Sequence, residues 1–321
     1  NPIVGICLTP NSLISVIKNI LLFLFIFYHH PLNAITIYVD PAGVDSTADG
    51  SLSNPYQYIQ TAIDASSDSD LIKLLPGSHE GIEYNVGNKK ISFTSTYSGT
   101  FDETIINQTI VLGKFYLNNN NSNSNAPDYN PTISGFTALR GIRLNRSSAM
   151  IIDMNISGDT YGIWLDFFSD ADIISSKISN CEKGILSEYS RFSLSNSIIY
   201  ENTGSGVSIN GNYVPNQYIL QNNLIIDNGE HGIYVAYNSD RYESIEIENS
   251  IIAGNKEHEL SVSMLVDSIH INNSNLCGVM INSYYYEASD FGVGNINENP
   301  LFCDRFNQNY SLASNSPSLG M

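Results

Sequence analysis

The sequence predicts an all-β fold, a right-handed parallel β-helix, and three observations support this prediction. A heptad recurs, as NSIIYEN at 196–202, NNLIIDN at 222–228 and NSIIAGN at 249–255. A glycine followed by an aliphatic residue recurs at intervals of 21, 22, 22 and 26 residues, at Gly141, Gly162, Gly184, Gly206 and Gly232. Inward and outward residues alternate after these glycines: Ile163 and Leu165 are expected to face inward, and Trp164 and Asp166 outward. A repeat near 22 residues with mostly Ile and Val favours stacked strands over leucine-rich repeats.

The recurring heptads follow from the way such coils stack. Equivalent residues of successive coils lie about 4.8 Å apart, so like residues stack on like residues. Asparagine tolerates the left-handed backbone of a tight corner, and stacked side-chain amides can hydrogen-bond along the axis. Two asparagine ladders are therefore predicted, one of Asn196, Asn222 and Asn249 and the other of Asn180, Asn202, Asn228 and Asn255.

Both ends of the solenoid need caps, because an open coil end exposes unpaired strand groups. Asn54-Pro55 is a typical helix start, and an apolar stripe follows it, so a capping helix is predicted over 54–65. Residues 71–75 (LIKLL) are predicted as a buried strand and 118–131 as a polar loop. The predicted single domain, 35–321, has its N-terminal cap at about 35–80, coils at about 81–295 and its C-terminal cap at about 296–321.

Residues 1–34 form a segment of different character. A lysine precedes the apolar block of KNILLFLFIF at 18–27, and a small residue, Ala34, follows. This is the layout of a secretory signal peptide with cleavage after Ala34. A retained N-terminal anchor is the alternative, although the block is shorter than the roughly 20 residues that span a membrane. We expect export, to the outside of the cell or its surface, and no transmembrane span beyond this segment.

The composition excludes some partners. The chain of 321 residues has 14 basic and 32 acidic residues, a net charge of −18, which argues against a nucleic-acid partner because phosphate binding needs basic patches. We expect a monomer. The four cysteines have no CxxC or metal-ligand spacing. Cys7 would leave with the signal peptide, and buried thiols rather than disulfides are predicted for the other three: Cys181, Cys277 and Cys303.

Three stretches resemble a known group, the secreted pectin-lyase-like β-helix proteins. They are IYVDPAGVDSTADGSLSNPYQYIQTAID at 37–64, LIKLLPGSHEG at 71–81, and NENPLFCDRFNQNYSLASNSPSLG at 297–320. The family pattern is a YV strand, a DG(S)xxNP turn, an IQxAID helix, a PGxYxE turn and a terminal DPxF…SPxIdxG cap; His79 stands where that turn often has tyrosine. The resemblance covers 35–321 and implies the fold and export. It leaves activity open, because the group mixes lyases, hydrolases, epimerases and adhesins.

The motifs of the known enzymes in this group are incomplete here. Those enzymes act on acidic or neutral polysaccharides along the outer face, pectate lyases with Asp/Glu calcium ligands beside an Arg or Lys base, and polygalacturonases with NTD, DD, GHG and RIK motifs. This sequence has no NTD, DD or RIK. GEHG at 229–232 is superficially similar to GHG, but Gly232 is the repeat glycine, so His231 is predicted to be a corner residue. Asp40, Asp45 and Asp49 lack the spacing of a calcium loop and are predicted to form turns.

The outer face of the strand after each repeat glycine is the candidate site. Because side chains alternate along a strand, two columns should point outward: Arg143, Trp164, Leu186, Ser208 and Tyr234, and Asn145, Asp166, Glu188, Asn210 and Ala236. Three aromatic residues fall at the adjoining bend: Phe167, Tyr189 and Tyr237. Aromatic rings beside carboxylates and amides suit a sugar, whose C–H groups meet the rings and whose hydroxyls meet the polar groups.

These positions carry the predicted roles. Trp164, Tyr234, Asn145, Asn210 and Tyr189 are the predicted substrate-binding residues, and Arg143, Asp166 and Glu188 are the predicted catalytic residues. Asp166 and Glu188 should lie one coil apart, close to the ~5 Å carboxylate separation of a retaining glycosidase. The same pair would equally suit a shared calcium ion, and a plain solvated surface is the third interpretation.

Two functional hypotheses follow. The first, which the missing hydrolase motifs favour, is an exported β-helix protein that binds polysaccharide or a cell-surface glycan without cleaving it. The second is a polysaccharide-degrading enzyme of pectate-lyase type that acts on acidic glycans with calcium. A purely structural role in a cell envelope is a third reading, and the sequence leaves open whether the chain is an enzyme.

Overall fold

A computed structural model describes residues 34–97, 99, 101–119, 130–158, 160–211, 216–236, 243–263, 268–276 and 278–320. The predicted export segment before Ala34, most of the predicted loop 118–131, and Tyr237, Cys7 and Cys277 lie outside these ranges. The chain divides into two units, Asn1–Ile35 and Thr36–Met321, and the second contains all the strands given below. No helix in the described part is long and apolar enough to cross a bilayer.

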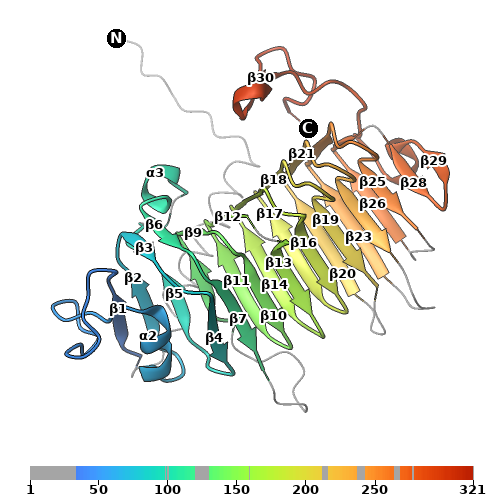
Figure 1. Ribbon diagram of the computed structural model, residues 1–321. Coiled ribbons are helices and arrows are strands. Elements are labelled where there is room, and N and C mark those ends of the chain that lie inside the picture. The colour runs from blue at the N-terminus through green and yellow to red at the C-terminus, as the bar shows by residue number, and fades with distance from the viewer. Residues whose placement is uncertain are drawn as a thin grey trace, which may run out of the picture. The chain divides into compact units, whose positions relative to one another are not determined.

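Three sheets of mainly parallel strands run along the solenoid, and from β2 to β28 each coil contributes one strand to each sheet (Figure 1). The first sheet contains β1 (Thr36–Val39), β2 (Leu71–Leu74), β5 (Ser92–Thr94), β8 (Thr132–Ser134), β11 (Ser148–Ile152), β14 (Asp170–Ile174), β17 (Arg191–Ser195), β20 (Asn216–Gln221), β23 (Glu243–Glu248) and β26 (Ser268–Asn272). The predicted strand over 71–75 is β2.

The second sheet carries the candidate site. It contains β4 (Glu83–Gly87), β7 (Lys114–Asn118), β10 (Ile142–Asn145), β13 (Tyr161–Asp166), β16 (Lys183–Glu188), β19 (Val207–Asn210), β22 (Ile233–Ala236), β25 (Leu260–Val262), β28 (Val279–Ile281) and β29 (Tyr284–Tyr286). Its last pair, β28 and β29, is antiparallel, and its other pairs are parallel.

The third sheet contains the aliphatic pairs of the heptads. Its strands are β3 (Gly77–His79), β6 (Thr109–Val111), β9 (Thr137–Ala138), β12 (Asn155–Ser157), β15 (Lys177–Ser179), β18 (Ile198–Tyr200), β21 (Leu224–Ile226), β24 (Ile251–Ala253) and β27 (Asn275–Leu276). The observed architecture is therefore the predicted parallel β-helix.

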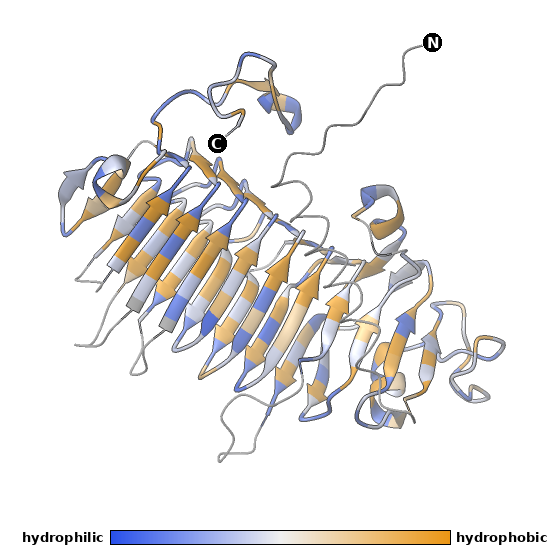
Figure 2. Ribbon diagram, turned by 180° about the vertical axis from the view of Figure 1, so that it is seen from behind, coloured by the Kyte–Doolittle hydropathy of each residue, from blue (hydrophilic) through white to orange (hydrophobic). Residues whose placement is uncertain are grey.

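The core lies inside the coils and confirms the predicted alternation. Figure 2 shows hydrophobic and hydrophilic residues alternating along many strands of the solenoid. In the second sheet the residues after the repeat glycines stack in register and are at most 1% exposed: Ile142, Ile163, Ile185, Val207 and Ile233. Since these residues fill the interior, the residue after each of them must face outward.

One predicted asparagine ladder is confirmed in part. The side-chain amide of Asn202 donates to Oδ1 of Asn228 over 2.9 Å, and that of Asn228 donates to Oδ1 of Asn255 over 2.9 Å. Asn180 was wrongly included, since it is exposed at a left-handed corner with φ of 57°. Cys181 takes the ladder position in that coil, and its backbone N–H donates to Oδ1 of Asn202 over 3.1 Å.

The second predicted ladder is displaced by one residue. Three asparagines occupy left-handed corners, as predicted, but they are exposed: Asn196, Asn222 and Asn249. The residues that follow them are buried instead: Ser197, Asn223 and Ser250. The backbone N–H of Ser197 donates to Oδ1 of Asn223 over 3.0 Å, and that of Asn223 donates to Oγ of Ser250 over 3.1 Å. The left-handed corner turns its own side chain outward and the next one inward.

The capping helix is shorter than the predicted 54–65. Helix α2 spans Ile59–Ala65, and Asn54 does not cap it. Asn54 forms a β-bridge with Ser51, and Tyr56 forms one with Val39, so the chain stays extended until the helix begins. The predicted apolar stripe is confirmed, because its members are buried: Ile59, Ala62 and Ile63. A second helix, α3 (Glu103–Ile106), lies before β6.

The C-terminal segment folds back along the third sheet. It contains the turns η1 (Ala288–Phe291) and η2 (Arg305–Asn307) and the antiparallel pair β30 (Phe302–Asp304) and β31 (Asn309–Leu312). Arg305 pairs with Asp227, with Nε to Oδ2 at 2.9 Å. Cys181 is a buried free thiol, as predicted, but Cys303 is exposed, because β30 belongs to a two-stranded ribbon that leaves this side chain uncovered.

Candidate functional site

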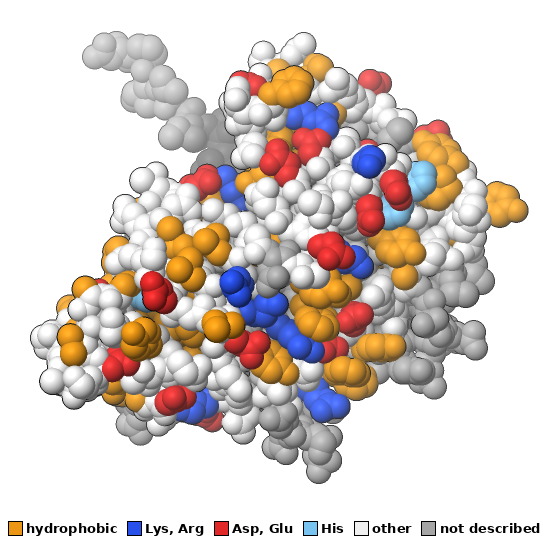
Figure 3. Space-filling view, viewed as in Figure 1, with side chains coloured by type: hydrophobic (Ala, Val, Ile, Leu, Met, Phe, Trp, Pro, Cys, Tyr) orange, Lys and Arg blue, Asp and Glu red, His pale blue; other side chains and the backbone are white. Residues whose placement is uncertain are grey.

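The register of the second sheet assembles both predicted columns. Arg143, Trp164, Leu186, Ser208 and Tyr234 are consecutive partners across β10, β13, β16, β19 and β22. Asn145, Asp166, Glu188, Asn210 and Ala236 form the second column on the same strands. Figure 3 shows hydrophobic, basic and acidic side chains next to one another across the middle of the visible face.

The two carboxylates of the second column have separate partners. Asp166 is 4% exposed, and its Oδ2 accepts from Nη2 of Arg143 at 2.8 Å and from Nδ2 of Asn145 at 3.2 Å. Glu188 accepts from Nε1 of Trp164 at 3.0 Å and from Nδ2 of Asn210 at 3.2 Å. Asp166 and Glu188 are register partners, and each accepts from its own pair of N–H donors.

Aromatic rings fix Arg143 on both sides. Its Cζ lies 3.7 Å from the ring centre of Trp164 and 5.1 Å from that of Tyr116, distances at which a cation is attracted to a ring face. Tyr116 lies beside Arg143 on β7 and was not predicted as a site residue. The prediction took the second residue after each repeat glycine as outward. In this coil the glycine, Gly113, lies one residue earlier than the register requires, so Tyr116 was missed. The alternation of buried Phe115 and Leu117 around Tyr116 was the available signal.

Part of the predicted outer face is covered. Leu186 and Ser208 belong to the predicted outward column, but Leu186 is 3% exposed and Ser208 is fully buried. The indole of Trp164 bonds to Glu188, two residues beyond Leu186 on the same strand, which places a large ring beside Leu186. Ser208 is a short side chain in register between Leu186 and Tyr234. The accessible part of the face is formed by its longer side chains.

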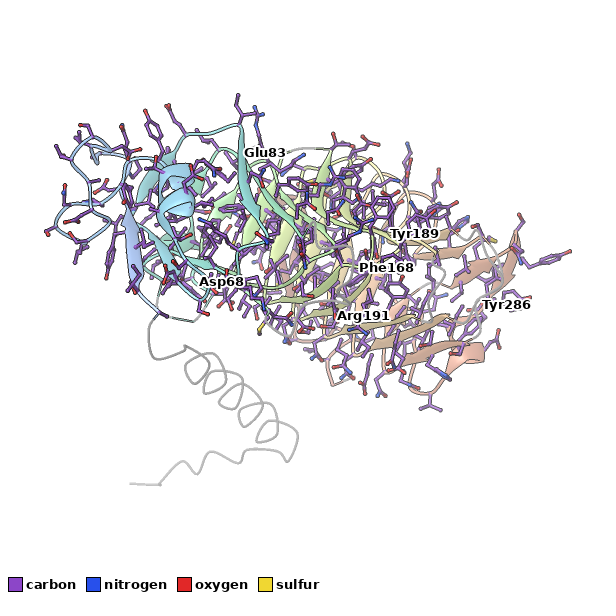
Figure 4. The ribbon with its side chains drawn as sticks, turned by 90° about the horizontal axis from the view of Figure 1, so that it is seen from below. Asp68, Glu83, Phe168, Tyr189, Arg191 and Tyr286 are labelled. Atoms are coloured by element: carbon purple, nitrogen blue, oxygen red, sulfur yellow. The ribbon has the colours of Figure 1, made fainter. Side chains whose placement is uncertain are left out.

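The bend after β13 and β16 carries exposed aromatic residues. The rings of Phe167 and Tyr189 stack 6.0 Å apart with planes at 11°, and Phe168 is half-exposed beside them in sequence. Figure 4 views this bend with Phe168 and Tyr189 near one another. All three residues have positive φ: 44° for Phe167, 61° for Phe168 and 52° for Tyr189. They are left-handed corners like those of other coils, although bulky side chains are uncommon in this conformation. Phe168 was not predicted; Phe167 and Tyr189 were.

A histidine stack borders the other end of the face. The ring of His231 stacks on Tyr234 at 5.0 Å and on His258 at 5.6 Å. Its Nε2 lies 3.1 Å from Oε2 of Glu257. Burial lowers the pKa of His231, and Glu257 opposes that effect. His231 lies directly before the glycine that starts β22, which is the corner position that the sequence predicted.

The donor set does not suit calcium. Three of the four carboxylate oxygens of Asp166 and Glu188 already accept from N–H groups, and Arg143 places a positive charge against Asp166. Calcium takes six to eight oxygen ligands. Within the described ranges no group of three or more His, Cys, Asp or Glu side chains could hold a metal ion. The predicted calcium role of this pair therefore has no support from its geometry.

The same contacts bear on catalysis. The guanidinium of Arg143 is held in an ion pair with Asp166, Nη2 to Oδ2 at 2.8 Å. Glu188 is likewise engaged by Trp164 and Asn210 rather than directed at open space. The arrangement presents rings, amides and a fixed cation on one face.

Comparison with known proteins addresses the fold. The family model "Right handed beta helix region" matches residues 140–300. Pectate lyase Pel9A has a similar structure, with a TM-score of 0.60 and 14% sequence identity over 88% of this chain and 90% of that chain. At that identity the similarity shows the fold alone. No curated protein matches the sequence.

Two further solved structures are more distantly similar. A rhamnogalacturonan lyase has a TM-score of 0.38 at 12% identity, over 77% of this chain and 82% of that chain. ORF18 of Geobacillus virus E2 has a TM-score of 0.41 at 12% identity, over 89% of this chain and 62% of that chain. Neither score supports an inference about the site.

Proposed function

This chain belongs to the family of right-handed β-helix proteins, and we propose that it is an exported protein that binds polysaccharide or a cell-surface glycan. The binding surface is the outer face of the second sheet with its adjoining bend. We call this surface the aromatic face and define it by seven residues: Tyr116, Tyr161, Trp164, Phe167, Phe168, Tyr189 and Tyr234.

The observation that carries the proposal is the group of aromatic side chains that stay partly exposed on the adjacent coils containing β13 and β16: Tyr161, Trp164, Phe167, Phe168 and Tyr189. Tyr161 contacts Trp164 with ring centres 5.2 Å apart, and Tyr116 and Tyr234 lie two and three coils away from Trp164 in its register column. Soluble monomers rarely expose contiguous apolar patches unless these bind something. A sugar presents C–H groups on its ring faces and hydroxyls at its edge, which matches flat rings beside polar groups.

Polar groups lie where the sugar hydroxyls would need them. Asn145 and Asn210 are half-buried, and each uses one N–H on a carboxylate. A side-chain amide has two N–H donors and a carbonyl acceptor, so further hydrogen-bonding capacity remains at each. These amides lie in the column next to the rings, so one ligand can contact both columns.

The enzyme hypothesis has weaker support. A lyase of the pectate type needs a base and calcium ligands, and here Arg143 is ion-paired while Asp166 and Glu188 are bound to N–H donors. The catalytic roles of these three residues, and cleavage of acidic glycans, stay predictions. Export stays a prediction, and it agrees with a ligand that is found outside cells. The monomeric state also stays a prediction.

Retention on immobilised polysaccharides tests the proposal. The full chain is compared with Trp164→Ala and with Tyr189→Ala on a panel of neutral and charged glycans. Truncating a well-placed aromatic residue in a binding site commonly costs more than about 1 kcal/mol, so each variant should elute earlier from the glycan that retains the wild type. Phe306→Ala is the control, because Phe306 is 99% exposed and lies in η2, away from the aromatic face. Equal retention of all four proteins would refute a role for this face.

A further inference from the structure

Basic residues are concentrated at one part of the aromatic face although the chain has a net charge of −18. Of its 14 basic residues, four lie on or next to β7 and β10, where residues 113–119 and 140–149 contain no Asp or Glu: Lys114, Arg140, Arg143 and Arg146. Figure 3 shows basic side chains gathered over the middle of the visible face. A local excess of positive charge on an acidic protein creates a surface potential that attracts anions.

Three of these residues lie along one coil. Arg140, Arg143 and Arg146 are three residues apart, and β10 runs between the outer two. Arg140 and Arg146 are exposed, whereas Arg143 is half-buried and paired with Asp166. At about 3.3 Å per residue the outer two are roughly 20 Å apart along the chain. They therefore flank the sheet at its two bends.

Each of these arginines is matched by an aromatic residue 21 positions later: Tyr161, Trp164 and Phe167. Arg143 stacks on Trp164, and Cζ of Arg146 lies 5.7 Å from the ring centre of Phe167. Rings at these distances hold a guanidinium plane in place, so less side-chain entropy is lost when it binds an anion. The arginines and the rings thus form adjacent rows across the sheet.

Carboxylates are absent from the two strands at the centre of this surface. Residues 113–119 and 140–149, which contain β7 and β10, include no Asp or Glu. Glu83 lies on β4 at one side, and Asp166 lies on β13 at the other, where it neutralises Arg143. Glu182 and Glu188 are one coil further away, beside Lys183. The attraction for an anion is therefore strongest over β7 and β10.

Unused hydrogen-bonding groups lie in the same place. Nε of Arg143 is buried and has no hydrogen-bond partner among the residues that the structure describes. Beyond Arg146 a small cavity is lined by Lys89, Lys90, Asn119, Ser147 and Ser148, among other residues. Ser148 is 2% exposed, and no group in the described ranges bonds to its hydroxyl. A buried polar group without a partner is costly, and an anionic ligand would supply acceptors at this end.

We propose that β7, β10 and the two bends of β10 form an anion-binding band for a negatively charged polysaccharide, which crosses the sheet along the strands. Arg140 and Arg146 bind its anionic groups, and Tyr116 and Trp164 contact its rings between them. This inference rests on the proposed function and adds the charge class and the direction of the ligand. Carboxylate and sulfate groups share the chemistry that guanidinium recognises, since both present paired oxygens.

Affinity measurements with the full chain test the band. The probes are alginate for carboxylate, dextran sulfate for sulfate, dextran as the neutral chain and a DNA duplex. Arg140→Ala/Arg146→Ala should weaken binding to the preferred anionic glycan about tenfold, as two lost surface charge contacts would. Arg140→Lys/Arg146→Lys should recover only part of that loss, because lysine keeps the charge but lacks the paired donors of the guanidinium. Lys256→Ala, which removes an exposed basic side chain on a distant coil, is the control and should change binding less than twofold.

Salt gives a second test. Binding of the wild type to the anionic glycan should weaken in about 0.5 M salt.

Other outcomes overturn the inference and separate it from the proposed function. If dextran binds as tightly as the anionic glycans, independently of salt, and Trp164→Ala abolishes this binding, the band is refuted and the aromatic face is supported. Anionic binding that is lost in the double arginine variant but kept in Trp164→Ala would support the arginine contacts and refute both the aromatic face and the contact of Trp164 with the ligand. Anionic binding that the double variant keeps would refute the band. DNA binding as tight as that of the glycans would refute the ligand class, and binding of none of the probes would refute the band.

Discussion

Asn202 and Asn228 lie one coil apart in the interior, and the side-chain amide of Asn202 donates to Oδ1 of Asn228 over 2.9 Å. Oδ1 of Asn228 also accepts from the backbone N–H of Asn202 over 3.2 Å. Asn228 repeats the pattern with Asn255. Each buried side-chain amide thus accepts a hydrogen bond from a backbone N–H at a corner of the neighbouring coil, which explains why the heptads end in asparagine.

Removing the middle amide of this ladder should destabilise the solenoid. Asn228→Ala leaves the Asn202 amide without its acceptor and removes a donor to Oδ1 of Asn255, at a site that is 1% exposed. Buried groups that lose their partners cost about 1–3 kcal/mol each. We expect the urea midpoint of unfolding to fall clearly. Asn222→Gly is the control, because Asn222 is an exposed left-handed corner where glycine fits; a comparable loss in both variants would contradict the role of the ladder.

The ion pair under the aromatic face should contribute more to stability than one on the surface. Arg143→Ala leaves Asp166, whose side chain is 5% exposed, without its cation. We expect a loss of about 1–3 kcal/mol in the free energy of unfolding. Arg191→Ala removes a similar pair with Asp170, in which the arginine side chain is 58% exposed, and should cost less than about 1 kcal/mol. Equal unfolding midpoints for the two variants would show that burial does not matter here.

Asp153 should make stability depend on pH. Burial raises the pKa of this carboxyl to about 6 in the folded chain, whereas its value in an unfolded chain is about 3.9. Between these values the folded chain holds a proton that the unfolded chain has lost, so stability falls as pH rises from about 4 to about 6. Above that range the cost stays constant.

Replacing the carboxyl of Asp153 tests whether its ionisation lowers the stability of the folded chain. Asp153→Asn removes the charge and suits the left-handed backbone there, with φ of 53°. We expect it to raise the free energy of unfolding at pH 7 by about 1–2 kcal/mol and to flatten the profile between pH 4 and 6. Asp64→Asn, an exposed carboxyl in α2, controls for the loss of one negative charge. A lower melting temperature for Asp153→Asn at pH 7 would mean that the carboxylate is stabilising.

The fold could be predicted because its determinants are local and repeated. Ile163 and Leu165 alternate with outward residues, and the coil spacing fixes which residues become neighbours. The site was predicted less completely, because exposure on a solenoid face depends on side chains from adjacent coils. Ser208 is covered although it points outward. Tyr116 was missed because its coil departs from the glycine spacing.

Cleavage measured together with retention tests the central claim most directly, namely that the aromatic face binds a polysaccharide without breaking it. The full chain is incubated with each glycan that retains it, in calcium and then in chelator, and new reducing and unsaturated ends are counted. We expect retention without new ends in either condition, and loss of retention in Trp164→Ala. New chain ends that disappear in Arg143→Ala would contradict the claim and identify an enzyme.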